Sequence, residues 1–92
     1  VLIDCNESSE RAIPIIDTLK NLKSAFKELD FIKVNGHSTD AIVSSMSNIK
    51  KSQILLCKTI KGYPISFMQH NFAWHHRTPN EDEILKIKEE LK

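Results

Sequence analysis

The 92-residue sequence is poor in the residue types that build special sites: it has two cysteines, two glycines, three prolines and one tryptophan. It contains no Cys-x-x-Cys or His-Glu-x-x-His spacing, which excludes the common zinc sites. No serine stands in a Gly-x-Ser-x-Gly turn, so the sequence has no nucleophile elbow. Cys5 and Cys57 lie in or beside apolar runs, which favours two buried, reduced thiols over a disulfide.

Neither sign of charge dominates, because 13 Lys and Arg residues face 12 Asp and Glu residues and the formal net charge is +1. This balance gives no support to a nucleic-acid or membrane-surface partner. The longest apolar runs, such as 54–57, are too short to cross a bilayer, and no signal-peptide pattern is visible. We therefore expect a cytoplasmic protein. Val1 opens an apolar run without a leading Met, so we also expect a piece of a longer protein.

Hydrophobic patterning predicts alternating strands and helices along the whole chain. Strands are expected at 1–4, 31–34 and 53–60, helices at 14–29, 38–49 and 79–92, and a long loop at 63–78. Ser38 or Thr39 can cap the second helix, with Asp40 in its first turn. The order strand–helix–strand–helix–strand–long loop–helix predicts an α/β fold with a parallel sheet, part of a three-layer sandwich. If the strands progress in one direction, both connecting helices share one face.

Parallel sheets of this kind bind ligands beyond the carboxyl ends of their strands. Three polar segments are predicted there, 4–6, 35–37 and 58–62, and long ordered loops such as 63–78 are usually functional. Asn6, at the end of the first strand, can offer an amide oxygen to a hard cation such as Mg²⁺. We interpret residues 1–92 as one partial domain cut from a larger sheet.

The adjacent pair His75 and His76 stands in the long loop, directly after the single tryptophan, Trp74. A structural role, in which the two rings pack within the loop, is as good an interpretation of the pair as a ligand-binding role. Adjacent side chains point in different directions, which disfavours one shared metal ion. A histidine above the strand ends can instead donate to an anionic ligand or move a proton near it. We expect His37 to orient a turn, and Trp74 and Phe72 to anchor the loop.

The stretch "KTIKGYPISFMQHNFAWHHRTPNEDEI" resembles the diphosphate-binding domain of the transketolase family, above all the split type with a separate N-terminal subunit. The family pattern there is T-[IV]-K-G-x-G-x-S-[FM]-M-E, followed by W-H-G-x-x-P-x-x-x-E. The residues that match it are Thr59, Ile60, Lys61, Gly62, Ser66, Phe67, Met68, Trp74, His75, Pro79 and Glu83. Upstream, "VNGHSTDAI" is similar to V-D-G-H-D-x-x-A-I, and "VLIDCN" is similar to the strand that ends the thiamine diphosphate motif.

The resemblance implies thiamine diphosphate and a divalent metal, Mg²⁺ or Ca²⁺, as cofactors. Asn6 would ligate that metal through its side chain, and Ser8 through its main-chain carbonyl. His75 would contact the diphosphate and the reacting sugar as the catalytic residue, while Lys61 and Gly62 would belong to the cofactor-binding segment. The family transfers a two-carbon ketol unit between sugar phosphates, so the resemblance implies a transferase of carbohydrate metabolism, such as the pentose phosphate reactions.

A pyrimidine-binding domain or a C-terminal transketolase subunit would complete the active site, in a homodimer or heterotetramer. The 92 residues by themselves are therefore expected to be inactive. Two positions depart from the family: His76 stands where glycine is usual, and Pro64 replaces the second glycine of the K-G-x-G turn. Two alternatives stay open, a thiamine diphosphate enzyme of the α-keto-acid dehydrogenase type and a non-catalytic assembly domain derived from the transketolase fold.

Overall fold

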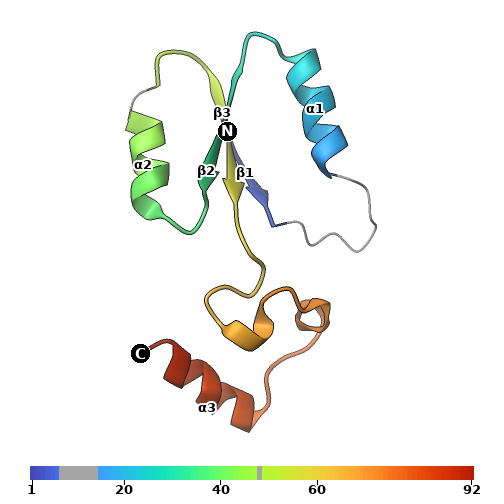
Figure 1. The fold of residues 1–92 in the computed structure, drawn as a ribbon, viewed down its shortest axis with the longest axis vertical. Helices are drawn as coiled ribbons and strands as arrows, with labels where there is room; N and C mark the ends of the chain where they lie inside the picture. The colour runs from blue at the N-terminus through green and yellow to red at the C-terminus, as the bar shows by residue number, and fades with distance from the viewer. Residues whose placement is uncertain (7–14, 48) are drawn as a thin grey trace. The chain divides into compact units, whose positions relative to one another are not determined.

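The computed structural model describes residues 1–6, 15–47 and 49–92, and its ribbon is drawn in Figure 1. In chain order, the elements are β1 (Leu2–Cys5), α1 (Ile15–Ala25), β2 (Asp30–Asn35), α2 (Thr39–Ser47), β3 (Gln53–Lys58), the 3₁₀ turns η1 (Ser66–Met68) and η2 (Phe72–His75), and α3 (Glu81–Glu90). They form two compact units, Val1–Thr59 and Ile60–Lys92. The predicted α/β class with a parallel sheet is confirmed.

The first unit is a three-stranded parallel sheet in the order β1-β3-β2. The central strand β3 pairs with β1 on one side and with β2 on the other, so that Cys57 lies beside both Asp4 and Val34. Its four consecutive apolar residues, 54–57, are all buried, and Leu55 is 2% exposed. A continuous apolar run is what a strand needs when both faces of its sheet are covered.

The strand order places the two connecting helices on opposite faces of this sheet. The β1-to-β2 connection passes over β3, whereas the β2-to-β3 connection returns one step in the other direction. Right-handed crossovers that run in opposite directions put their helices on opposite faces. Figure 1 shows α1 and α2 on the two sides of the strands. The strands therefore do not progress in one direction, which was the condition for both helices to share a face.

The start of α2 has the expected cap. The helix α1 ends earlier than expected. The Ser38 hydroxyl accepts a hydrogen bond of 3.2 Å from the Ala41 N–H, and Asp40 lies in the first turn of α2. The helix α1 stops at Ala25 rather than continuing to Leu29. A turn closed by Leu29 N–H on the Phe26 carbonyl follows, because the chain must reverse before β2 begins at Asp30.

The second unit contains η1, η2 and α3, and Ile65 is its buried hydrophobic residue. A capping box starts α3: Asn80 accepts from the Glu83 N–H and Glu83 accepts from the Asn80 N–H, each at 2.9 Å. Such reciprocal bonds satisfy two amides that the first helical turn leaves open. The helix was expected from Pro79, and the cap places its first residue at Glu81 instead.

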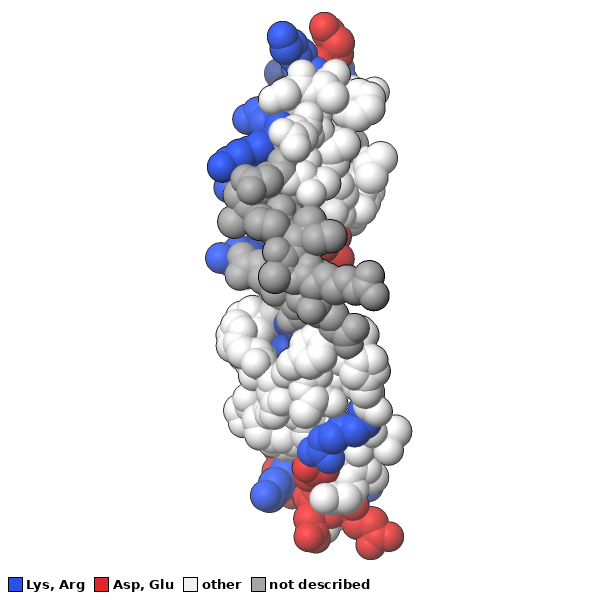
Figure 2. Space-filling model, turned by 90° about the vertical axis from the view of Figure 1, so that its right-hand side faces the viewer, with Lys and Arg blue, Asp and Glu red and all other residues white. Residues whose placement is uncertain are grey.

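Charged side chains of both signs lie on the face shown in Figure 2, with uncharged surface between them. Among the described residues, no helix combines the length and the apolar character needed to cross a membrane.

Candidate functional site

At the carboxyl edge of the sheet, the ends of β1 and β3 are joined through the side chain of Asp4. The Thr59 hydroxyl donates to Asp4 Oδ1, and Asn6 Nδ2 donates to Asp4 Oδ2 at 3.2 Å. The strand pairing continues one step further, since the Thr59 N–H donates to the Cys5 carbonyl at 3.4 Å. With its nitrogen turned to Asp4, the Asn6 amide directs its oxygen away from that carboxylate.

The turn after β2 reaches the same edge because Gly36 has no side chain. Its N–H donates to the Lys58 carbonyl at 2.8 Å, and a Cβ at this position would lie 2.4 Å from the Thr59 methyl carbon. The next residue, His37, donates its N–H to Asn35 Oδ1 at 3.0 Å, which closes the turn before α2. The segment forms the predicted turn through this bond from the His37 N–H to the Asn35 side chain, and His37 is exposed.

One oxygen at this edge fits a hard divalent cation in its chemistry. Asn6 offers an amide oxygen, a kind of ligand that Mg²⁺ and Ca²⁺ accept, whereas both Asp4 oxygens already accept hydrogen bonds from Thr59 and Asn6. Within the described ranges, no group of three or more His, Cys, Asp or Glu side chains is positioned to hold a metal ion. Ser8, the other expected ligand, lies outside the described residues. A cation at Asn6 therefore depends on backbone oxygens, water or a ligand for its other contacts.

In the second unit, the Lys61-Gly62 segment forms a tight turn. Gly62 has φ of +87°, in the left-handed region that favours glycine, and a Cβ there would lie 2.4 Å from the Met68 carbonyl oxygen. The Ile65 N–H donates to the Gly62 carbonyl at 2.9 Å. This turn contains Pro64, which follows a cis peptide bond.

His75 ends η2, and its Nδ1 atom lies in hydrogen-bond contact with the Lys61 ammonium group. The Phe72 ring lies nearly parallel to the His75 ring, with centroids 5.8 Å apart and planes at 22°. The His76 ring meets the His75 ring edge to face, at 4.6 Å and 88°. The two histidine rings are thus perpendicular, as their adjacency implies, yet they pack against each other. His75 is exposed, and its ring is held by three neighbours within the second unit.

Trp74 anchors the loop, as the sequence predicts. Its indole N–H donates to the Phe67 carbonyl at 3.3 Å, and its ring lies 5.5 Å from the Phe67 ring. The Arg77 guanidinium covers the indole at 3.7 Å from the ring centroid and also bonds Glu83 in α3. Phe72 is 45% exposed, and within the loop its ring stacks against that of His75.

Two carboxylates of α3, those of Glu83 and Glu90, bond residues of the loop, and the pKa of each is lowered. The hydrogen bond from the Arg77 side chain and then the Asn80 N–H lower the pKa of Glu83. The pKa of Glu90 is lowered because its carboxylate accepts from the Ser66 N–H at 2.6 Å and the Ser66 hydroxyl at 2.7 Å. Both bonds stabilise the charged form of the glutamate.

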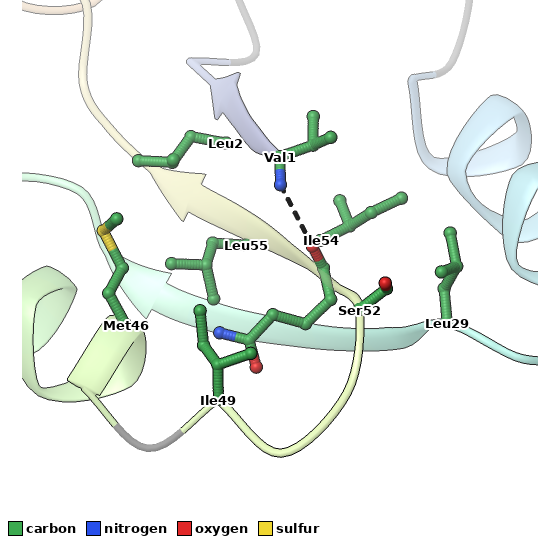
Figure 3. A pocket seen from close by; sticks show the side chains of 9 residues that line it. Val1, Leu2, Leu29, Met46, Ile49, Ser52, Ile54 and Leu55 are labelled. Atoms are coloured by element: carbon green, nitrogen blue, oxygen red, sulfur yellow. Dashed lines mark hydrogen bonds between the residues drawn. The ribbon is translucent and has the colours of Figure 1, made fainter.

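An apolar cavity of about 340 Å³ lies elsewhere in the first unit, toward the amino ends of the strands. Figure 3 shows Leu2, Met46, Ile49 and Leu55 lining it, and the dashed line is the bond from the Val1 nitrogen to the Gln53 carbonyl at 3.0 Å. The lining carries no titratable side chain, so this cavity offers no acid, base or cation ligand for catalysis.

The expected site residues thus fall into two groups, one in each compact unit. Asn6 joins Asp4 and Thr59 in the first unit, and Lys61 joins His75 in the second. Sequence reasoning missed the roles of Asp4, Thr59 and Phe72. The spacing of Asp4 and Asn6, two residues apart at the end of one strand, is a signal that could have found the first of these.

A known protein that resembles this chain is an apulose-4-phosphate transketolase subunit from Actinobacillus succinogenes. The two are 33% identical over 60 residues, which covers 62% of this chain and 22% of that protein. The chain therefore spans about a fifth of the length of this relative. No family model matches the sequence, and no solved structure matches it either. Over these 60 residues, the chain is similar to one chain of a transketolase.

Proposed function

We propose that the chain is the C-terminal part of a thiamine diphosphate-binding domain in a transketolase-like enzyme. The full protein transfers a two-carbon ketol unit between sugar phosphates. The similarity to a transketolase subunit over 60 residues is the observation that carries this proposal. The α/β sheet with polar groups at its carboxyl edge supports it, because such sheets bind ligands at that edge.

In this proposal the first unit binds the divalent metal, Mg²⁺ or Ca²⁺. Asn6 ligates it through the amide oxygen, and Ser8 through its main-chain carbonyl. Asp4 holds the Asn6 amide by accepting from its nitrogen, and the Thr59 hydroxyl holds Asp4 in turn. A ligand whose orientation is fixed by a second hydrogen bond binds its metal more tightly than a freely rotating one.

The second unit contributes contacts to the diphosphate and the sugar. Thiamine diphosphate, when bound, supplies the electron sink that makes the two-carbon transfer possible. His75 donates a hydrogen bond to an anionic oxygen and moves protons at the sugar. Gly62, which has no side chain, lets the backbone approach the cofactor closely, and Lys61 adds a positive charge to the same segment.

The partner in this proposal is a pyrimidine-binding domain or a C-terminal subunit, joined in a homodimer or heterotetramer. The relative is named as one subunit of its transketolase, which supports a second chain in that enzyme. Its name also gives apulose 4-phosphate as the sugar phosphate on which it acts. We extend to this chain the broader class, sugar phosphates.

An activity assay on the full-length protein tests the proposal. The protein is combined with its pyrimidine-binding domain or partner chain, thiamine diphosphate and Mg²⁺. We expect transfer of a ketol unit from a ketose phosphate to an aldose phosphate. Decarboxylation of an α-keto acid without ketol transfer would favour the α-keto-acid dehydrogenase type and contradict our proposal.

The second candidate is a non-catalytic assembly domain, and the side chains at two family glycine positions favour it. His76 brings an imidazole ring and Pro64 a fixed backbone angle to places where the family has no side chain. On this alternative, the full protein lacks the Gly-Asp-Gly that begins the thiamine diphosphate motif, and it binds its partner chain without turnover. The presence of that motif together with ketol transfer would exclude the alternative.

A further inference from the structure

The contact between Lys61 and His75 assigns a role to the lysine that the family resemblance does not give. We propose that Lys61 is a positioning residue that holds His75 in the tautomer with its proton on Nε2. This inference rests on the proposed function, since it concerns the histidine that contacts the diphosphate and the sugar. In this role Lys61 acts through His75, in addition to its place in the cofactor-binding segment.

The direction of the bond follows from the chemistry of the two groups. A lysine ammonium group has three N–H donors and no acceptor, so the Nδ1 atom of His75 must accept. A neutral imidazole carries one proton, and with Nδ1 accepting, that proton lies on Nε2. In histidines generally, the hydrogen bond that one ring nitrogen makes determines whether the other carries the proton. His75 therefore presents an N–H donor on the side of the ring away from Lys61.

The plane of the ring is fixed by the local backbone. Phe72 and His75 are three residues apart in η2, and side chains at this spacing eclipse each other in a 3₁₀ turn. Their rings consequently stack, with 22° between planes. His76 meets the His75 ring edge to face at 4.6 Å, and the Lys61 ammonium lies 6.0 Å from the Phe72 ring centroid. Phe72 and His76 thus restrict the His75 ring, and Lys61 determines which of its nitrogens carries the proton.

An N–H donor aimed outward is what an anionic diphosphate or sugar oxygen requires. In the other tautomer, the same ring atom would present a lone pair to that oxygen and repel it. Removal of the lysine donor frees His75 to adopt either tautomer. For histidines that bind metals, loss of the group that orients the ring typically costs about 10- to 100-fold in affinity or activity, and we expect a similar cost here.

The test uses the full-length protein with ¹⁵N-labelled histidine and a long-range proton–nitrogen NMR correlation, which distinguishes protonated from unprotonated ring nitrogens. The His75→Gln variant assigns the His75 signals by their loss. We expect wild type to show a protonated Nε2 and an unprotonated Nδ1. Lys61→Met keeps the length of the side chain without its donor, so it should mix the tautomers and lower kcat/KM for ketol transfer by about 10- to 100-fold.

Two matched variants separate this role from a structural one. Lys61→Arg retains a donor and should restore the Nε2–H tautomer and most of the activity. Lys86→Met removes a lysine from the exposed face of α3 and should change neither measurement. An Nδ1–H tautomer in wild type overturns the inference without any variant, as does an unchanged His75 spectrum in Lys61→Met. If the tautomer changes in Lys61→Met but wild type shows no ketol transfer, the positioning role stands and the proposed function fails.

Discussion

Different kinds of interaction stabilise the two compact units, each considered by itself. The first unit has a buried strand, β3, paired by backbone hydrogen bonds on both sides, and its core residues are apolar. The second unit buries Ile65 and otherwise depends on side-chain bonds, such as the Asn80 capping box and the double hydrogen bond from Ser66 to Glu90. Apolar burial therefore stabilises the first unit, and hydrogen bonds to carboxylates contribute to the stability of the second.

This difference in stabilising interactions fits the role that we propose for each unit, metal binding in the first and contacts to the diphosphate and sugar in the second. Asn6 and Asp4 stand at the end of a paired strand, and a metal ligand gains from such a rigid support. His75 stands in a 3₁₀ turn, and its ring contacts the side chains of Lys61, Phe72 and His76. A single substitution among these side chains can reorient the imidazole while the sheet stays intact.

The largest expected effect is that of Leu55→Ala in the full-length protein. Leu55 is 2% exposed at the centre of β3, and a leucine-to-alanine change at a buried site costs about 2–5 kcal/mol. The free energy of opening for the β3 amides, measured by hydrogen exchange, should fall by that amount. Leu85→Ala, at a residue 62% exposed on α3, is the control and should change it by less than about 0.5 kcal/mol. Equal effects of the two changes would contradict the assignment of the core to β3.

A smaller effect, confined to the second unit, is expected from Gly62→Ala. The new methyl group would lie 2.4 Å from a main-chain oxygen at Met68, at a φ of +87° that alanine disfavours. Backbone strain of this kind costs about 1–3 kcal/mol, and exchange of the loop amides around Trp74 should report it. Gly36→Ala should cost less, because φ is not positive there and the closest atom belongs to the Thr59 side chain. The reverse order would show that the Gly62 turn is not as rigid as described.

The smallest expected effect is a loosening of the second unit by acid. A carboxylate whose pKa is lowered on folding stabilises the fold above its unfolded pKa, about 4.3 for glutamate, and loses that contribution as the pH falls through the folded pKa. Protonation of Glu90 should therefore weaken its bonds to Ser66 below about pH 4.3. Exchange of the Ser66 amide, corrected for its intrinsic pH dependence, measures this loosening.

Two neighbouring substitutions sharpen the acid experiment. Glu90→Gln should remove most of the pH dependence of Ser66 protection, because the amide does not titrate. Glu89→Gln alters a carboxylate that bonds Lys92 instead, and it should leave the Ser66 profile as in wild type. An unchanged profile in Glu90→Gln would mean that another group controls the loop.

Much of the fold could be predicted from local sequence patterns. The apolar run at 54–57 identified the buried strand, Ser38 or Thr39 was the expected cap of α2, and Trp74 identified the anchor of the loop. Each of these signals depends on a residue and its close neighbours in the chain. The strand order did not follow from such signals. Tertiary packing decides which strand lies beside β1 and which beside β2, and local sequence does not specify it.

The contacts of the candidate site were less accessible to sequence reasoning. The Asp4–Thr59 bond joins residues 55 positions apart, and the Lys61–His75 bond joins residues 14 positions apart. Residue type shows that such groups can pair, but the folding of the chain decides which partners meet. The motif indicated that His75 contacts an anion, whereas the tautomer that it presents depends on the position of Lys61.

Steady-state kinetics of His75→Ala and His76→Ala in the full-length protein, with thiamine diphosphate, Mg²⁺ and its pyrimidine-binding partner, test the central claim most directly. The account predicts that His75→Ala lowers kcat/KM for ketol transfer by about 100-fold or more, as the loss of an acid–base group does, with folding intact by circular dichroism. His76→Ala removes an adjacent ring of the same kind and should lower it much less. Unchanged kinetics in His75→Ala would contradict the proposed role of this histidine and, with it, the transketolase-like assignment.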